Sequence, residues 1–171
     1  MAFDFGAVSA TPASPAFRRD RPSRCVRLVP DPPAAALHIP ASIDALDEVA
    51  RFVLRLGAEA GLSESALYRL RLASDELATN IVMHGYRGAT GEVSVAGGVD
   101  DERVWVRFED DAPAFDPRQG MRSPAVDVPL EEREIGGLGV YLAFTAVDSF
   151  EYELVSGRNV STLVMNRPVT G

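Results

Sequence analysis

The sequence predicts an α+β fold, a two-layer α/β sandwich in which helices cover one face of a β-sheet. Apolar residues recur at helical spacing in two successive segments, residues 42–60 and 63–85. Two later pairs of segments, within 92–110 and 149–165, alternate apolar and polar residues as half-buried strands do. With a short strand first and a third helix between the two hairpins, the order is β-α-α-β-β-α-β-β, which fits two layers.

The first elements are a short strand and an amphipathic helix. Residues 36–40, ALHIP, form a strand that Pro40 stops. Ser42 is a favourable N-cap, and acidic residues follow it where the helix dipole favours negative charge. We therefore expect a helix over 42–60, ended by Gly61, with an apolar stripe of Ile43, Leu46, Val49, Phe52, Val53 and Leu56.

The later elements follow from caps, turns and periodicity. Ser63 caps a second helix that runs to about Gly85, with Leu67, Leu70, Leu77 and Ile81 as its core stripe. The strands 92–99 and 103–110 form a hairpin, and the stretch 111–135 is rich in loops. A glycine turn then opens the third helix, and the last hairpin turns at a Gly-Arg pair.

The N-terminal segment differs in composition from the rest of the chain. Residues 1–36 hold six of the 12 Pro and no sustained periodicity, which predicts a flexible tail. The alternative is an extra edge strand around Cys25–Val29. We place the folded domain at 37–168 and a C-terminal tail at 169–171.

Charge and composition exclude several classes of protein. The tail has a net charge of about +2 and the rest about −10, so direct binding of nucleic acid is disfavoured. All 17 basic residues are Arg, and the absence of Lys excludes the P-loop and the strand lysine of ordinary protein kinases. A single Cys excludes an internal disulfide. The sequence predicts neither a membrane span nor a signal peptide, so a cytoplasmic protein is expected.

Polar residues flank the core stripe of the second predicted helix. Glu76 and Asn80 lie about 40° apart on the helical wheel, with Met83 and His84 nearby. Asn is unfavourable inside a helix unless its amide is used. These side chains would line the rim of whatever the helix packs against. An ordinary, partly exposed polar face is the alternative.

A second group of residues lies where the strand 103–110 ends. Asp110 is followed by the small residues Ala112 and Ala114 and by Phe115. An acceptor carboxylate beside small residues and an aromatic ring suits the edge of a flat heterocycle that bears an amino group. The alternative is an acidic turn with a buried Phe.

The third group is the glycine-rich stretch IGGLG, residues 135–139, directly before the third helix. Such a turn exposes backbone N–H groups where the helix dipole favours an anion. A glycine-rich loop is weak evidence by itself, but the three groups in this order are specific together.

This combination resembles the ATP-binding module of the GHKL superfamily, the Bergerat fold of gyrase, Hsp90, histidine kinases and MutL. Glu76 and Asn80 match its N-box, Asp110-x-Ala112-x-Ala114 its Asp-x-Gly-x-Gly box, and Gly137-Leu138-Gly139 its second glycine box. The resemblance covers about residues 37–168 and is greatest to anti-sigma factor serine/threonine kinases of the RsbW and SpoIIAB type. It implies a mainly antiparallel mixed sheet with three helices on one face.

The resemblance also implies roles for individual residues. Asn80 would hold the Mg²⁺ that bridges the ATP phosphates, Glu76 would act as general base, and Asp110 would recognise the adenine amino group. The remaining positions implied to border the nucleotide are Met83, His84, Phe115, Arg133, Gly137, Leu138, Gly139, Val140 and Thr162. Ala112 and Ala114 stand where glycines are usual, and each would cost about 1 kcal/mol if its position required positive φ.

The implied function is phosphorylation of a STAS-type anti-anti-sigma protein with Mg-ATP, together with binding of a sigma factor. A homodimer is also implied. Two alternatives remain open: a nucleotide-dependent module that binds its partner without phosphotransfer, and a catalytic fragment like that of a histidine kinase, for whose phospho-accepting hairpin the chain lacks room.

Overall fold

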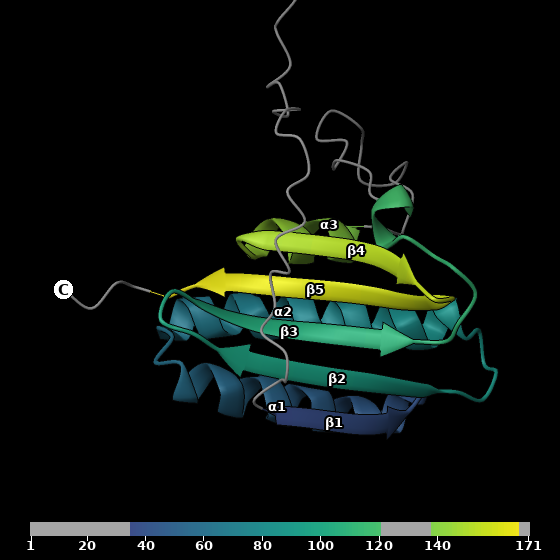
Figure 1. Ribbon diagram of the computed structural model, residues 1–171, viewed down its shortest axis with the longest axis horizontal. Helices are drawn as coiled ribbons and strands as arrows, with labels where there is room; N and C mark the ends of the chain where they lie inside the picture. The colour runs from purple at the N-terminus through teal and green to yellow at the C-terminus, as the bar shows by residue number, and fades with distance from the viewer. Residues whose placement is uncertain (1–34, 121–137, 168–171) are drawn as a thin grey trace, which may run out of the picture.

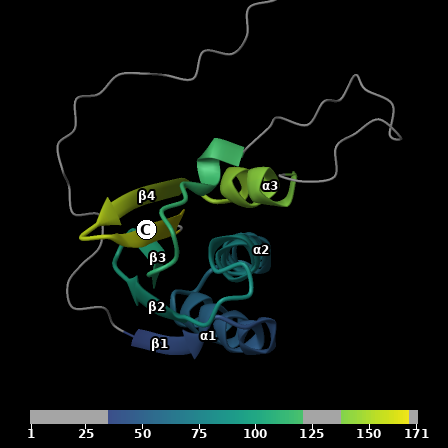
Figure 2. The same cartoon turned by 90° about the vertical axis from the view of Figure 1, so that its right-hand side faces the viewer.

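The computed structural model describes residues 35–120 and 138–167 and confirms the α+β class. Three helices lie on one face of a five-stranded sheet, as Figures 1 and 2 show from two directions. The predicted tails fall almost wholly outside the described residues, although Ala35 and Ala36 already belong to the first strand. No helix in the described ranges has the length and apolar character needed to cross a membrane.

The sheet has the order β1-β2-β3-β5-β4. Its strands are β1 (Ala35–Pro40), β2 (Glu92–Val99), β3 (Arg103–Asp110), β4 (Ser149–Val155) and β5 (Arg158–Asn166). Every pairing between these strands is antiparallel, so the described sheet lacks the parallel component of the expected mixed sheet. The β4–β5 turn is Ser156-Gly157, both with positive φ as the preferred two-residue hairpin turn requires, and Arg158 belongs to β5 rather than to the turn.

The first helical segment differs from its prediction at its start. Residues Ile43–Ala45 form a 3-10 turn, and α1 (Leu46–Glu59) begins after it. Ser42 occupies the N-cap position of this 3-10 turn with an extended backbone, as predicted, but its side chain makes no capping hydrogen bond. Ala45 is buried, whereas Ile43, which the sequence placed in the apolar stripe, is 57% exposed.

The second helix, α2 (Glu64–Asn80), starts as predicted. The Ser63 hydroxyl accepts a hydrogen bond from the Ala66 amide at 3.3 Å. The helix continues without interruption into a five-residue π-helix, Ile81–Gly85, which ends where the sequence predicted. The other helices are a 3-10 turn at Pro117–Gly120 and α3 (Leu138–Ala146), which packs against α2.

The core lies between the helices and the sheet. Alternate residues of β3 and β5 point toward the helices, so Val104, Val106 and Phe108 pack with Leu163 and Met165 beneath α2. Leu70 and Leu77 of α2 complete this layer and are fully buried. The same alternation brings the last helix-facing residue of β3, Asp110, opposite Asn159 of β5. The edge of the core therefore ends in a pair of polar side chains.

Candidate functional site

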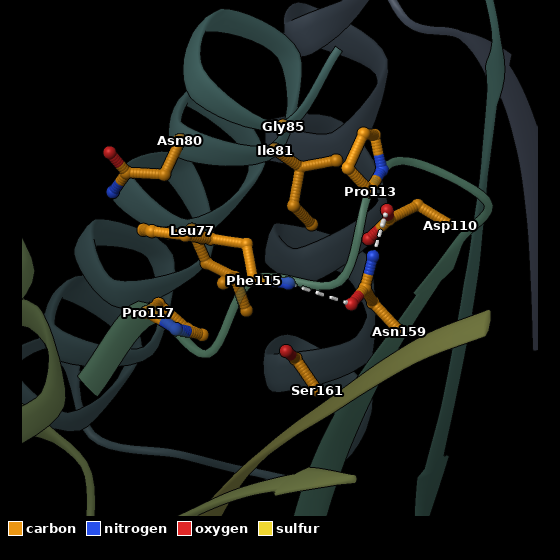
Figure 3. Close-up of a pocket in the computed structure, with 10 residues that line it drawn as sticks. All are labelled: Leu77, Asn80, Ile81, Gly85, Asp110, Pro113, Phe115, Pro117, Asn159 and Ser161. Atoms are coloured by element: carbon orange, nitrogen blue, oxygen red, sulfur yellow. Dashed lines mark hydrogen bonds between the residues drawn. The ribbon is translucent and has the colours of Figure 1, made fainter. Parts of the chain in front are cut away.

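A pocket lies where the C-terminal end of α2 meets the ends of β3 and β5 (Figure 3). Its empty space of about 310 Å³ includes a part that is open to solvent, so the enclosed part is smaller. Its walls are mainly apolar, with a few polar groups at defined places. The lining residues are Leu77, Asn80, Ile81, Gly85, Asp110, Pro113, Phe115, Pro117, Asn159 and Ser161.

The helical wall of the pocket ends in the π-helix. The Tyr86 amide donates to the Ile81 carbonyl at 3.0 Å, which closes the wide turn. Ile81 and Gly85 both line the pocket, and Gly85 lies against Ala112 of the facing loop. A Cβ at Gly85 would stand 3.2 Å from that of Ala112, so the absence of a side chain permits the close approach. π-Helical turns of this kind are frequent at functional sites.

Asn80 is placed at the pocket with its amide oxygen available. Its Nδ2 donates to the backbone carbonyl of Glu76 at 2.8 Å, and no described residue donates to its Oδ1. The Glu76 side chain, one turn earlier, is half-buried and makes no hydrogen bond or ion pair within the described ranges. Glu76 does not line the pocket. The predicted pair is therefore divided between a residue of the pocket wall and a residue beside it.

Asp110 ends β3 as a buried carboxylate, 3% exposed. Its Oδ1 accepts hydrogen bonds from Asn159 Nδ2 at 2.8 Å and from the Ala112 amide at 3.0 Å. No described residue donates to the second oxygen, Oδ2. Figure 3 shows Asp110 and Asn159 pointing toward one another at the edge of the pocket. The carboxylate is thus fixed through one oxygen, and the other remains an acceptor.

Burial raises the pKa of the Asp110 carboxyl above its usual range. The hydrogen bonds from Asn159 and Ala112 favour the ionised form and oppose the rise, as does the positive charge of Arg158. The negative charge of Asp111 adds to it. A ligand group that donates to this carboxylate would supply a hydrogen bond that the buried charge lacks.

Tyr86 fixes the start of the loop that follows Asp110. Its hydroxyl donates to the Glu92 carbonyl at 2.7 Å and accepts from the Asp111 amide at 3.2 Å. The ring covers Gly91, where a Cβ would overlap ring carbons. The end of the helical segment, the start of β2 and the end of β3 are therefore joined by one side chain.

Ala112 and Ala114 are accommodated without backbone strain. Neither has positive φ; the described non-glycine residues with positive φ are Arg87 and Ser156. The Ala112 methyl group is buried against Gly85, and Ala114 is exposed. The penalty that the sequence suggested for alanine at these positions does not arise in this conformation.

Of the predicted site residues, the pocket brings together Asn80, Asp110 and Phe115. Phe115 is 41% exposed, and its amide donates to Asn159 Oδ1 at 3.2 Å. On the second helical segment and the loop after β3, the predicted residues outside the lining are Glu76, Met83, His84, Ala112 and Ala114. Met83 and His84 are exposed on the π-helix.

The prediction for Thr162 is corrected by the register of β5. Thr162 pairs with Arg107 and Glu151 and lies on the sheet face opposite the helices, because side chains alternate along a strand. Ser161, one residue earlier, lines the pocket and is 4% exposed. The hydroxyl that β5 contributes to the site therefore belongs to Ser161.

Sequence reasoning missed Asn159 and the apolar walls. Asn159 and Ser161 occupy the same alternate positions of β5 as the core residues Leu163 and Met165, so they face the helices once the register of β5 is known. A strand face that is apolar at one end and polar at the other indicates a site at the edge of the core. Leu77 and Ile81 were predicted as core residues, and both also line the pocket.

The glycine-rich stretch is only partly described. Arg133 and Gly137 lie outside the described residues. Leu138, Gly139 and Val140 form the first residues of α3 itself, and the rest of the predicted glycine turn, residues 135–137, lies outside the described residues. Their roles toward a phosphate remain predictions.

The donor set at the pocket fits a nucleotide with a hard cation. No group of three or more His, Cys, Asp or Glu side chains in the described ranges could hold a metal ion by itself. The free Asn80 Oδ1 is an oxygen of the kind that Mg²⁺ prefers, and the other ligands of such an ion would come from phosphates and water. The apolar walls and the Asp110 acceptor suit a heterocyclic base.

The chain is similar to several known proteins. Residues 39–165, which contain every pocket residue, match the family described as Histidine kinase-like ATPase domain. A Serine-protein kinase RsbW from Bacillus licheniformis is 32% identical over 117 residues, 66% of this chain and 73% of that protein. Another from Listeria innocua is 30% identical over 109 residues, 61% of this chain and 69% of that protein. A solved structure with the RsbU and RsbW domains of a Mycobacterium tuberculosis protein aligns with a TM-score of 0.49 and 23% identity, over 80% of this chain and 34% of that one.

Proposed function

The chain belongs to the histidine kinase-like ATPase domain family and is related to the serine-protein kinases named RsbW, and from this premise we propose that it is an ATP-dependent protein serine/threonine kinase. Its substrate would be a Ser or Thr hydroxyl on a STAS-type anti-anti-sigma protein. When it is not bound to that partner, the same protein would bind a sigma factor. Phosphorylation of the anti-anti-sigma protein would then decide which of the two partners is bound. A cytoplasmic location and a homodimer are parts of this proposal.

The observation that carries the proposal is the pocket between α2 and the ends of β3 and β5. Two side chains with a free acceptor oxygen line it: the carboxylate of Asp110 and the amide of Asn80. The first suits the exocyclic amino group of adenine, and the second suits Mg²⁺ on the phosphates. Apolar side chains between them would contact the two faces of the base, with Phe115 on the solvent side.

Glu76 is the proposed general base. When bound, Mg-ATP supplies the phosphoryl group and the charge that stabilises its transfer. Glu76 would accept the proton of the partner's hydroxyl, whose oxygen bonds to the terminal phosphorus as the bond to the oxygen of ADP breaks. Glu76 lies one turn from Asn80 on the same side of α2, so the base and the cation ligand are held by one rigid helix.

The test is transfer of label from [γ-³²P]ATP to a purified STAS partner. We expect labelling that depends on Mg²⁺ and falls by about 10²–10⁴-fold in Glu76→Gln with ATP affinity unchanged. Glu59→Gln, an exposed position at the end of α1, is the matched control. A partner that stays unlabelled while the wild-type protein binds ATP would contradict the kinase proposal.

A nucleotide-dependent binding module without phosphotransfer is the second candidate. It is favoured by the position of Glu76, which lies outside the pocket lining and has no described hydrogen-bond partner to orient its carboxylate. Glu76→Ala separates the two candidates. If this variant controls its partner as the wild type does, stoichiometric binding is the function.

A further inference from the structure

Asn159 is a buried amide whose hydrogen-bonding groups are all used. It is 4% exposed and faces Asp110 across the β3–β5 pair. Its Nδ2 donates to Asp110 Oδ1 at 2.8 Å and to the Ala112 carbonyl at 2.9 Å. Its Oδ1 accepts from the Tyr152 hydroxyl at 2.7 Å and from the Phe115 amide at 3.2 Å. Two donor hydrogens and two acceptor sites are the whole capacity of this side chain.

These four bonds fix two parts of the pocket and the neighbouring strand β4 relative to one another. Asp110 belongs to β3, the loop that follows it carries Phe115, and Tyr152 belongs to β4. A change in the orientation of the amide would break bonds on both sides at once. Asn159 therefore determines where the Phe115 loop lies and how the Asp110 carboxyl is turned.

The Asp110 carboxyl presents only one oxygen to the pocket. Oδ1 already accepts from Asn159 and from the Ala112 amide, so neither of those donors is available to a ligand. An ionised carboxylate has no hydrogen to donate, and the remaining Oδ2 is complementary to an amino group and not to a carbonyl oxygen. Two donors on Oδ1 also favour the ionised form.

We propose that Asn159 is a positioning residue that sets the preference of the site for 6-aminopurine nucleotides over purine nucleotides without that amino group. Asn159 acts through Asp110: its Nδ2 holds Oδ1, and this leaves Oδ2 as an acceptor in the pocket. The inference rests on the proposed binding of ATP. It adds the residue that orients the base-recognising carboxylate.

A purely structural role predicts a different result. If Asn159 only stabilised the fold or the loop, its loss would weaken every purine nucleotide by the same factor. If it orients the carboxylate, its loss and the loss of the 6-amino group remove the same interaction, and their effects are not additive.

The experiment measures calorimetric Kd values of the full chain for ATP and for purine riboside 5′-triphosphate, which lacks the 6-amino group. In the wild type we expect ATP to bind about 10-fold more tightly, as for a hydrogen bond to a charged group. In Asn159→Ala we expect the affinity for ATP to fall to that for the analogue. The affinity for the analogue should change little. Thr162→Val is the matched control, because Thr162 is equally buried on the opposite face of β5 and should retain the wild-type ratio.

Asn159→Asp keeps the shape and places a second carboxyl beside Asp110. Two carboxylates in one site raise each other's pKa, and a proton shared between them restores a hydrogen bond that links the two side chains. We expect its ATP affinity to fall more steeply than that of the wild type between pH ~5.5 and ~8.5. The wild type is measured alongside because the phosphates of ATP also titrate. Other ionisable groups described near Asp110 are Asp111, Arg158, Tyr86 and Tyr152, which both proteins share.

The outcomes separate this inference from the proposed function. Wild-type protein that binds neither nucleotide overturns both. Wild-type protein that binds the two nucleotides equally overturns the role of Asn159 and leaves ATP binding intact. Equal weakening of both nucleotides in Asn159→Ala also overturns it. If Asn159→Ala does not fold, the pH series of Asn159→Asp decides, and a profile parallel to that of the wild type refutes the inference.

Discussion

Replacing Asp110 with Asn reverses one hydrogen-bonding group in the pocket without changing its size. The Asn Oδ1 can still accept from Asn159 at 2.8 Å and from the Ala112 amide at 3.0 Å. Its Nδ2 then occupies the position of the free Oδ2. The acceptor that faces the base becomes a donor, and the 6-amino group of ATP meets a second donor.

The affinity for ATP should fall by the value of a hydrogen bond to a charged group, about 1.5–3 kcal/mol, which is about 10- to 150-fold in Kd. GTP, whose 6-oxo group is an acceptor, should weaken less or bind more tightly. Calorimetric titration with both nucleotides measures this change. Asp111→Asn is the control, because it removes the same charge from an adjacent, exposed carboxylate.

The effect of Asp110→Asn on folding stability should be opposite in sign to its effect on ATP affinity. Burial raises the pKa of Asp110, so the folded protein binds this proton more tightly than the unfolded chain. By linkage, the contribution of Asp110 to stability is most favourable below its unfolded pKa and decreases as pH rises through its folded pKa. Asp110→Asn removes this decrease, so at pH 7–8 its thermal midpoint should equal or exceed that of the wild type, with the advantage lost in acid.

Two results would refute this reasoning. Unchanged ATP affinity in a folded Asp110→Asn protein would show that Asp110 does not contact the base. Equal losses for ATP and GTP would show that the change disturbs the pocket as a whole and does not alter its hydrogen-bonding pattern.

Three further substitutions test the framework around the site. Ser63→Ala removes the capping bond to Ala66 and should lower the unfolding free energy by about 1 kcal/mol in urea denaturation, whereas an unchanged value would mean that the cap is not used in solution. Gly91→Ala places a methyl group inside the space of the Tyr86 ring and should destabilise by about 1–3 kcal/mol, with no effect expected if the ring were free to move. Arg167→Ala leaves the carbonyls of Ala60 and Asp100 without a donor and should cost about 1–3 kcal/mol in thermal unfolding; a loss below 0.5 kcal/mol would indicate that water replaces the guanidinium.

The element order followed from the sequence because both periodicities are strong. The alternation of 92–99 and 103–110 gave the bounds of β2 and β3 directly, and Ser63 marked the start of α2. The sequence did not predict the type of helical turn, because that depends on hydrogen bonds that the residues do not specify. Nothing in the residues of Ile81–Gly85 distinguishes a π-turn from an α-turn, and the close approach of Gly85 to Ala112 of the facing loop is a tertiary contact.

Site residues were predicted correctly where a single helix or strand is enough to fix their position. Asp110 and Asn80 follow from the end of a strand and the face of a helix. Thr162 was misplaced because β5 is apolar on both faces, so its sequence does not specify which parity points inward. A shift of one residue moves a side chain to the other face, and the register with β3 that fixes it is a tertiary property.

Trp105, the only tryptophan of the chain, gives the protein an internal optical probe. It is 1% exposed on the sheet face opposite the pocket, over Gly98, with the Arg107 guanidinium 5.8 Å from its ring centre. Its fluorescence therefore reports on the integrity of β3 without contact with a bound base. A ligand that binds only the folded state stabilises it by an amount that grows with the logarithm of one plus the ratio of its free concentration to its Kd. Fluorescence-detected unfolding therefore measures nucleotide affinity through a residue that the nucleotide does not touch.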